Sequence, residues 1–207
     1  MIKKIRKLGI SGGTFDPIHY GHLIIAEDIR ESFKLDKVIF IPSGMPPHKD
    51  ITKVTDARHR YNMVRIAIDN NPYFEASSIE LDRPGYTYTV DTLIQLKEIY
   101  GEDTKLYFIT GADVVPELLT WKNYQKIFKL CEFITVLRPG YKKSTFIEAV
   151  EKMRVEHGAI IHLTEAPLIG ISSTIIRTRM NENKSIKYLV PEKVEKYIFD
   201  NMLYVFK

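Results

Sequence analysis

The segment Ile10-Ser-Gly-Gly-Thr-Phe-Asp-Pro-Ile-His-Tyr-Gly-His-Leu23 decides the fold of this chain. An apolar run that ends at Ile10 leads into the Gly12-Gly13 pair, and an amphipathic run from Leu23 to Phe33 follows. This pattern predicts a strand, a glycine loop and the first turn of a helix. Such a junction offers free backbone N–H groups and the positive end of a helix dipole to an anion.

Two histidines in this segment suggest which anion it binds. His19 and His22 are three residues apart, so they share one face of a helix, and Gly21 leaves that face open to close approach. Two imidazoles beside a helix N-terminus suit a polyphosphate. The alternative is an ordinary glycine-rich turn with two solvated histidines. We favour the polyphosphate site because the histidine pair, the glycines and the strand-to-helix context coincide.

The composition limits the class of protein. The chain has 207 residues, of which 44% are hydrophobic and 27% charged, as in a soluble globular protein. The net charge of +4 suits an enzyme with anionic substrates. Because no run of lysine or arginine forms a polybasic arm, we expect no nucleic-acid partner.

The single cysteine and the lack of long apolar runs indicate the compartment. Cys131 alone can form neither an internal disulfide nor a cysteine-based zinc site, and its place before an apolar run predicts a buried thiol. No apolar stretch approaches the roughly 20 residues that span a bilayer, and no signal-peptide pattern is seen. We expect a cytoplasmic protein with no membrane partner. The sequence leaves the oligomeric state open, a homo-oligomer included.

Strand-like and helix-like runs alternate along the chain. Several strand candidates are continuously apolar, as expected of parallel strands covered on both faces. The alternation predicts an α/β fold with a Rossmann-like, doubly wound parallel sheet, and residues 1–207 form one domain with a small C-terminal helical part. The predicted strands are Lys7–Ser11, Lys37–Pro42, Phe74–Ser77, Lys105–Thr110, Glu132–Leu137 and Ala159–Leu163, and the predicted helices are His22–Phe33, Asp56–Asp69, Thr89–Tyr100, Tyr124–Leu130, Ser144–His157, Thr174–Asn181 and Glu192–Asn201.

Other motifs follow predicted strands, where open α/β sheets bind their ligands. The proline-stiffened loop Ile41–Lys49 presents His48 and Lys49, either as a rigid surface loop or as a second phosphate contact. Asp113 could hydrogen-bond ribose hydroxyls or only cap the next helix. Trp121, the only tryptophan, suits a core or half-buried position.

Two further segments introduce helices. Thr87 or Thr89 can cap the helix that starts near Thr89. In the segment Ile171-Ser-Ser-Thr-Ile-Ile-Arg177, a serine can cap a helix, and Arg177 lies one turn later, close enough to act on the same anion. The alternative is an ordinary capped helix with a solvated arginine. The two helix N-termini, at His22 and at Ile171–Arg177, would each bind phosphate, and together they would serve two anionic substrates or one long polyphosphate.

The His-x-Gly-His pattern at His19 resembles the nucleotidyltransferase superfamily of α/β-phosphodiesterases. The longer match that begins at Gly12 is similar to the bacterial nicotinate-nucleotide adenylyltransferases, and the likeness extends from Ile10 to Arg177 in the family's motif order. The other motifs that carry it are Pro46-Pro-His-Lys49, Thr87–Thr92, Gly111-Ala-Asp113 with Trp121, Arg138-Pro-Gly140 and Ile171–Arg177.

The resemblance implies adenylyl transfer from ATP to nicotinate mononucleotide, giving deamido-NAD and pyrophosphate, with Mg²⁺ carried by ATP and no metal held by the protein. It implies a catalytic set and a larger substrate-binding set. The catalytic residues are His19, His22, Lys49 and Arg177, and the binding residues are Gly12, Gly13, Thr14, Phe15, His48, Tyr88, Thr89, Gly111, Asp113, Trp121, Arg138, Ile171, Ser172, Ser173 and Thr174.

The resemblance also implies how the substrates are divided over this set. Tyr88 and Thr89 would hold the nicotinate and its carboxylate, Trp121 would stack on the ring, and Arg138 would lie on the ATP side. The chain departs from the family at Tyr86-Thr87, where Pro-Ser is common, and at Lys122, where a tyrosine is usual.

Other functions compete with this one. A sister enzyme would use nicotinamide mononucleotide, phosphopantetheine or glycerol phosphate, and the Tyr88 and Trp121 segments argue against the last two. A non-catalytic nucleotide sensor should have lost a histidine or Arg177, and this chain keeps them. A nucleic-acid-binding module, such as a synthetase fragment, should carry a basic stripe or a Lys-Met-Ser-Lys-Ser-type loop, and the chain has neither.

Overall fold

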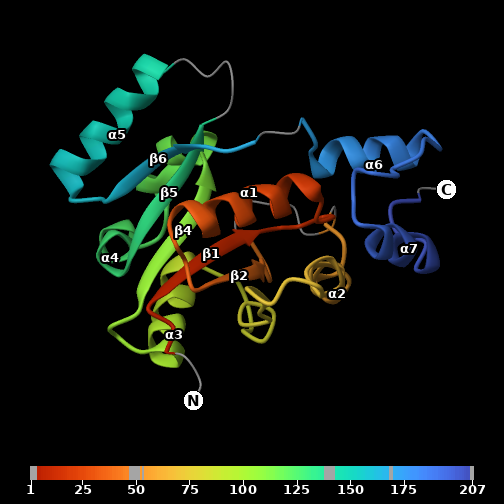
Figure 1. Ribbon diagram of the computed structural model, residues 1–207, viewed down its shortest axis with the longest axis horizontal. Coiled ribbons are helices and arrows are strands. Elements are labelled where there is room, and N and C mark those ends of the chain that lie inside the picture. The colour runs from red at the N-terminus through yellow and green to blue at the C-terminus, as the bar shows by residue number, and fades with distance from the viewer. Residues whose placement is uncertain (1–3, 47–51, 53, 138–142, 168–169, 206–207) are drawn as a thin grey trace.

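The computed structural model describes residues 4–46, 52, 54–137, 143–167 and 170–205. Its strands form one parallel sheet with helices on both faces (Figure 1). The spatial order β3-β2-β1-β4-β5-β6 is that of a doubly wound sheet, in which the chain builds outward from β1 and then crosses to its other side at β4. The predicted α/β fold with its doubly wound sheet is confirmed.

The elements match the predicted alternation. The strands are β1 (Lys7–Gly13), β2 (Lys37–Pro42), β3 (Phe74–Ala76), β4 (Lys105–Gly111), β5 (Cys131–Leu137) and β6 (Ile161–Glu165). The helices are α1 (Tyr20–Ser32), α2 (Ala57–Ala67), α3 (Thr89–Tyr100), the 3-10 helix η2 (Ala112–Thr120), α4 (Tyr124–Leu130), α5 (Lys143–His157), α6 (Ser173–Asn181) and α7 (Glu192–Asp200).

The boundaries of β1, α1, α2 and β6 differ from the prediction by two residues, and those of β1 and α1 affect the histidine motif. Gly12 and Gly13 pair with Ile41 and Pro42 of β2, so they end the strand instead of forming a turn. Helix α1 begins two residues earlier than predicted, which makes His19 its N-cap. The sequence pattern did not predict η2, because a 3-10 helix interrupted by Pro116 lacks the 3.6-residue period of an α-helix.

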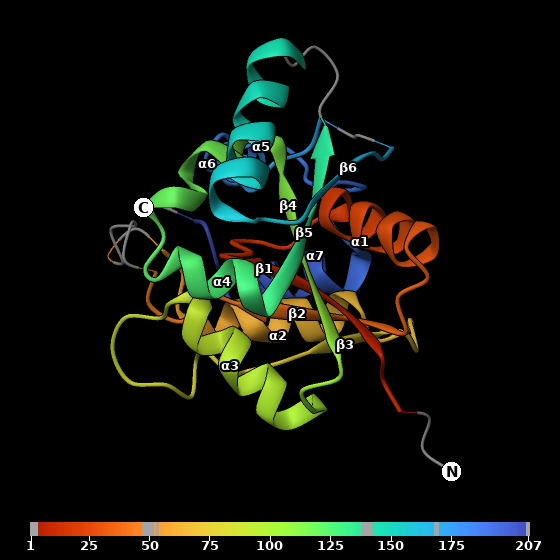
Figure 2. The ribbon, with the colours of Figure 1, turned by 90° about the vertical axis from the view of Figure 1, so that its left-hand side faces the viewer.

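Each face of the sheet is covered by its own apolar layer. Val38 and Phe40 of β2 belong to the layer under α1, α2, α6 and α7, while Ile39 and Ile41 belong to the layer under α3, α4 and α5. Side chains alternate between the faces of a strand, so a strand covered on both sides is apolar throughout. Figure 2 shows α1 on one side of the strands and α4 on the other. Cys131 is buried in the second layer, as predicted, and burial raises the pKa of its thiol.

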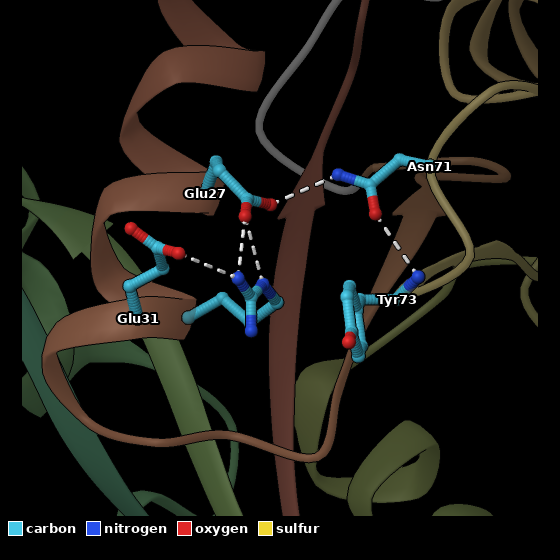
Figure 3. A network of polar contacts seen from close by, with 5 residues as sticks. Glu27, Glu31, Asn71 and Tyr73 are labelled. Atoms are coloured by element: carbon cyan, nitrogen blue, oxygen red, sulfur yellow. Dashed lines mark hydrogen bonds and ion pairs between the residues drawn. The ribbon is translucent and has the colours of Figure 1, made fainter.

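A polar network fixes α1 beside the edge of the sheet that carries β3. Asn71 donates to Glu27 (2.9 Å) and accepts from the backbone N–H of Tyr73 (3.0 Å), as Figure 3 shows. Arg30 donates to Glu27 and Glu31 and lies 4.3 Å over the Tyr73 ring. The C-terminal half of the helix that follows the two histidines is therefore held against the segment before β3.

The C-terminal helices form a small group at one end of the molecule. In Figure 1, α6 and α7 lie opposite α5. Asn62 and His59 of α2 both contact the hydroxyl of Tyr197 in α7, at 3.1 and 2.9 Å. The backbone N–H of Tyr20 donates to Leu189 in the segment between α6 and α7 (3.1 Å). This group therefore packs against the start of α1 and against α2.

Candidate active site

A pocket of about 510 Å³ opens at the carboxyl ends of β1, β2 and β4. It lies between the neighbouring strands β1 and β4. At this point the order in which strands are added to the sheet reverses, and the connecting helices on either side of it cover opposite faces. Its size is that of a small-molecule site. The predicted site residues that line it are Gly12, Gly13, Thr14, Phe15, His22, Tyr88, Thr89, Gly111, Asp113 and Trp121.

His19 and His22 stack at the start of α1. Their ring centroids are 3.7 Å apart, and the backbone N–H of His19 donates to Nδ1 of His22 (3.2 Å). A neutral His22 ring that accepts at Nδ1 carries its proton on Nε2, so it can donate to a ligand. A Cβ at Gly21 would lie 3.0 Å from Nδ1 of His19, so the glycine makes room for this ring.

The two rings differ in exposure. His22 lines the pocket, whereas His19 is buried at the helix N-cap, and its Nδ1 has no hydrogen-bond partner among the described residues. His19 has an extended backbone, so the two rings meet by stacking across the cap and not along one helix face as predicted. The structure nevertheless brings the pair together.

Burial keeps both imidazoles neutral in the ligand-free protein. It lowers the pKa of His19 to about 4. The pKa of His22 is held well below its usual value by burial and by the positive charge that His19 would carry. At neutral pH both rings are therefore uncharged N–H donors beside the pocket.

We expect this arrangement to weaken the ligand-free protein in acid. Unfolded His19 titrates near 6.5 and folded His19 near 4, so between these pH values the unfolded state binds more protons and the free energy of unfolding falls as pH falls. The His19 contribution to this loss reaches on the order of 3 kcal/mol at pH 4. Denaturant unfolding across this pH range should show a flatter profile for His19→Asn than for the wild type. Equal slopes for His19→Asn and the wild type would contradict the assignment.

The N-terminus of α6 lies against the loop between β1 and α1. Ser173 Oγ donates to the carbonyl of Pro17, 156 residues earlier in the chain (2.9 Å). Arg177 Nη1 donates to the carbonyl of Asp16 (2.7 Å), and its Nη2 lies 3.4 Å from Thr174 Oγ1. The two segments predicted to bind phosphate therefore meet at one place.

Ser172 is the residue that caps this helix. Its Oγ accepts from the backbone N–H of Ile175 (3.2 Å), which confirms one of the two predicted caps. Ile171 precedes the cap, and its carbonyl lies 3.7 Å from the Cβ that Gly21 would carry. The predicted phosphate-binding residues of α6 are thus beside the start of α1, although they do not line the pocket itself.

The other end of the pocket is aromatic. Trp121 is half-buried and meets Phe108 edge to face, with ring centroids 5.6 Å apart. Lys122 Nζ lies 4.0 Å over the ring of Tyr88, and all three of Trp121, Lys122 and Tyr88 line the pocket. An apolar ring that carries a negative substituent would fit these surfaces.

The predicted capping of α3 by Thr87 or Thr89 is wrong. Tyr88 is the N-cap in an extended conformation, and no side chain caps this end. Thr87 lies one residue too early and Thr89 is already the first helical residue. Thr87 Oγ1 is buried and without a hydrogen-bond partner in the described ranges. The start of α3 thus faces the pocket without a side-chain cap.

Gly111 and Asp113 lie where β4 passes into η2. Gly111 is the N-cap of η2, so the alternative that Asp113 caps this helix is wrong. A Cβ at Gly111 would lie 2.4 Å from Asp113 Oδ1, so any larger residue would displace this carboxylate. The glycine therefore lets the aspartate lie close to the strand end at the pocket.

Two polar side chains at the site carry no motif in the sequence. Glu80 lines the pocket and accepts from Thr92 Oγ1 (2.8 Å). Arg60 is 1% exposed and donates to the carbonyl of Thr14 (2.7 Å) behind the pocket wall. The sequence does contain one indication that Arg60 is buried. Its spacing from Met63, Val64 and Ala67 places it on the same face of α2, and the rest of that face is apolar.

Three predicted site residues, His48, Lys49 and Arg138, lie outside the described residues. Within the described ranges, no group of three or more histidine, cysteine, aspartate or glutamate side chains could hold a metal ion. Among the helices of the same ranges, not one combines the length and apolar character needed to cross a membrane.

Residues 10–179 match the model of the cytidylyltransferase-like family. The probable nicotinate-nucleotide adenylyltransferase of Thermoanaerobacter sp. (strain X514) is 54% identical over 96% of this chain and 94% of its own length. That of Moorella thermoacetica is 50% identical over 99% and 94%. The chain belongs to the nicotinate-nucleotide adenylyltransferases. The family predicted from the histidine motif is thus confirmed, and the chain is a nucleotidyltransferase.

Solved structures agree on the fold of this family. The nicotinic acid mononucleotide adenylyltransferase of Plasmodium falciparum complexed with NaAD has a TM-score of 0.78 at 23% identity, with 96% of this chain and 97% of that chain covered. The same protein complexed with APC has a TM-score of 0.76 over the same coverage. At this level of identity the likeness establishes the architecture, and the roles of individual residues rest on the geometry above.

Proposed function

We propose that this nucleotidyltransferase transfers the adenylyl group of ATP to nicotinate mononucleotide, forming deamido-NAD and pyrophosphate. The observation that carries the proposal is the meeting of the α1 and α6 N-termini beside a pocket with an aromatic end. Helix N-termini favour phosphate groups. A site that combines two of them with an aromatic pocket suits two nucleotides whose phosphates react with each other.

The reaction needs no covalent intermediate with the protein. The phosphate of the mononucleotide is already ionised, so its oxygen attacks the α-phosphorus of ATP directly, and the bond from that phosphorus to the bridging oxygen of pyrophosphate breaks. No proton has to be removed from the nucleophile. Catalysis therefore consists of aligning the two substrates and stabilising the charge that develops on the leaving pyrophosphate.

The ATP half of the site is assigned to the loop after β1 and to α6. The Nε2–H of His22 donates to the reacting phosphates, with His19 stacked behind it. The first turn of α6, at Ser173 and Thr174, holds the triphosphate, and Arg177 neutralises its charge. Lys49, His48 and Arg138 are proposed to add charge and donors on this side, and Mg²⁺ enters as part of the ATP substrate.

The mononucleotide half is assigned to the aromatic end. Trp121 stacks on the nicotinate ring, and the start of α3 at Tyr88 and Thr89 binds its carboxylate. Asp113 accepts from ribose hydroxyls. Lys122 Nζ, which lies over Tyr88 at this end of the pocket, adds a positive charge near the carboxylate.

Substrate choice tests the proposal directly. Pyrophosphate release with ATP should be faster for nicotinate mononucleotide than for its amide, by tens- to thousands-fold in kcat/KM, because hydrogen bonds to a charged group contribute roughly 1.5–3 kcal/mol each. Lys122→Met should lower this ratio about two- to fivefold, as expected for a solvent-accessible charge pair. Lys126→Met, on the exposed side of α4, serves as the control with an unchanged ratio.

Two outcomes would contradict these assignments separately. Equal kcat/KM values for the acid and the amide would reject nicotinate mononucleotide as the preferred acceptor and leave adenylyl transfer standing. An unchanged ratio in Lys122→Met would reject only the contribution of this lysine. Release of pyrophosphate from CTP and not from ATP would reject adenylyl transfer itself.

A further inference from the structure

A buried arginine joins three separate segments behind the candidate active site. The Arg60 side chain donates from Nε to the carbonyl of Thr55 (2.8 Å), from Nη1 to Thr14 (2.7 Å) and from Nη2 to Ser43 (2.7 Å). These carbonyls belong to the segment before α2, the loop after β1 and the loop after β2. A planar guanidinium offers donors in a rigid fork, so one side chain holds all three segments in a defined relation.

The next link is the carboxylate of Asp16 in the loop after β1. Its Oδ1 accepts from the hydroxyl of Tyr204, which comes from the C-terminal end of the chain, 188 residues away (2.7 Å). Its Oδ2 accepts from the backbone N–H of Thr55 (3.3 Å). Asp16 and Tyr204 are both buried, at 5% and 8% exposure. Hydrogen bonds between such buried groups are costly to break, because the group left behind is unsatisfied.

Between Thr14 and Asp16, which are held by these hydrogen bonds, lies a residue with a strained backbone. Phe15 has a φ of 50°, in the left-handed region that residues with side chains rarely adopt, and it is 3% exposed. Such a backbone persists where its surroundings hold it. Here Arg60 holds the carbonyl of Thr14 just before it, and Tyr204 holds the carboxylate of Asp16 just after it.

The strained residue contacts a histidine of the site. The ring of Phe15 meets the ring of His22 edge to face, with centroids 5.0 Å apart. The carbonyl of Asp16 also accepts from Arg177 of α6 (2.7 Å). The backbone path from Thr14 to Asp16 therefore sets where both His22 and Arg177 lie.

We propose that Asp16, Arg60 and Tyr204 form a positioning cluster, which holds the loop after β1 so that His22 and Arg177 are aligned for phosphate transfer. None of the three touches the reacting atoms in this scheme. The expected effect of the cluster on kcat rests on the proposed function. Its effect on the geometry of the loop after β1 can be tested without substrate.

The most direct test removes one hydroxyl. Tyr204→Phe keeps the buried ring and deletes the donor to Asp16. We expect kcat to fall about tenfold, since a small displacement of a catalytic group costs much of its effect, while KM for ATP and for the mononucleotide stay within about twofold. A merely structural role would lower the amount of folded protein and leave kcat per folded molecule unchanged.

A matched control lies in the same part of the molecule. Tyr197→Phe deletes a hydroxyl that contacts His59 (2.9 Å) and Asn62 (3.1 Å), between α7 and α2, and both of these hydrogen bonds lie away from the loop after β1. Both variants weaken the attachment of the C-terminal helices through one hydroxyl. Only Tyr204→Phe should lower kcat.

Nuclear magnetic resonance of the imidazole protons gives a readout that needs no substrate. The chain has six histidines, so each signal can be assigned by substitution. In Tyr204→Phe the signals of His19 and His22 should move, and in Tyr197→Phe the signal of His59 should move instead. If the wild type shows no adenylyl transfer, the proposed function fails while this measurement still decides on the cluster.

A second variant covers the case in which Tyr204→Phe does not fold. Arg60→Lys keeps the charge and cannot reach three carbonyls in the same fork geometry. It should lower kcat about tenfold or more and should shift the His22 signal. The proposal is overturned if the folded variants keep wild-type kcat with unmoved His19 and His22 signals, or if Tyr197→Phe lowers kcat as much as Tyr204→Phe does.

Discussion

His22→Ala is expected to lower kcat by about 100-fold or more, the usual loss when a preorganised donor to a developing charge is removed. His22 lines the pocket, and its Nδ1 is occupied by the backbone N–H of His19, which leaves its Nε2–H as the donor that we propose for the reacting phosphates. Steady-state pyrophosphate release and denaturant unfolding should be measured on the same preparation. Stability should change far less than turnover.

The neighbouring ring provides a comparison. His19→Ala should also lower kcat, because His22 loses the ring that stacks on it at 3.7 Å. His162→Ala, on β6 at the edge of the sheet, serves as a control with near-normal turnover. A folded His22→Ala protein that turns over at the wild-type rate would remove this residue from the reacting centre.

Arg177→Ala is expected to lower kcat/KM for ATP by about 10- to 100-fold, the range for the loss of a hydrogen bond to a charged group. Its guanidinium lies between the carbonyl of Asp16 and Thr174 Oγ1, at the junction of the two segments proposed to bind phosphate. Arg177→Lys should recover only part of the activity, since a point charge replaces a planar fork.

The effects of Arg177→Ala on ATP and on the mononucleotide can be measured separately. Quenching of the fluorescence of Trp121, the only tryptophan, reports mononucleotide binding, which should be unchanged in Arg177→Ala. Arg179→Ala on the same helix is the matched control, because its Nε donates to the carbonyl of Ser185 outside the site (2.7 Å). Equal losses for ATP and the mononucleotide would place Arg177 elsewhere in the site.

Much of this molecule could be predicted from local sequence patterns. Predominantly apolar strands such as β2 and β5, alternating with amphipathic helices, specify a parallel sheet covered on both faces, because burial on both sides favours apolar residues at successive positions. The histidine pair and the capped helix at Ser172 are local as well. They depend on backbone groups within a few residues, so a short stretch of sequence contains the information.

The arrangement around those motifs was decided by the tertiary structure. Arg60 belongs to the buried face of an amphipathic helix, and only the folded chain brings the carbonyls of Thr14, Ser43 and Thr55 around it. The bond between Tyr204 and Asp16 joins residues 188 positions apart, and the contact of Arg177 with Asp16 spans 161. No local sequence pattern predicts such pairs, because each partner taken alone is indistinguishable from an ordinary surface or core residue. Sequence patterns by themselves thus determined the α/β sheet and the family and singled out the two segments proposed to bind phosphate, whereas the packing of the C-terminal helices against the start of α1 decided how those segments meet.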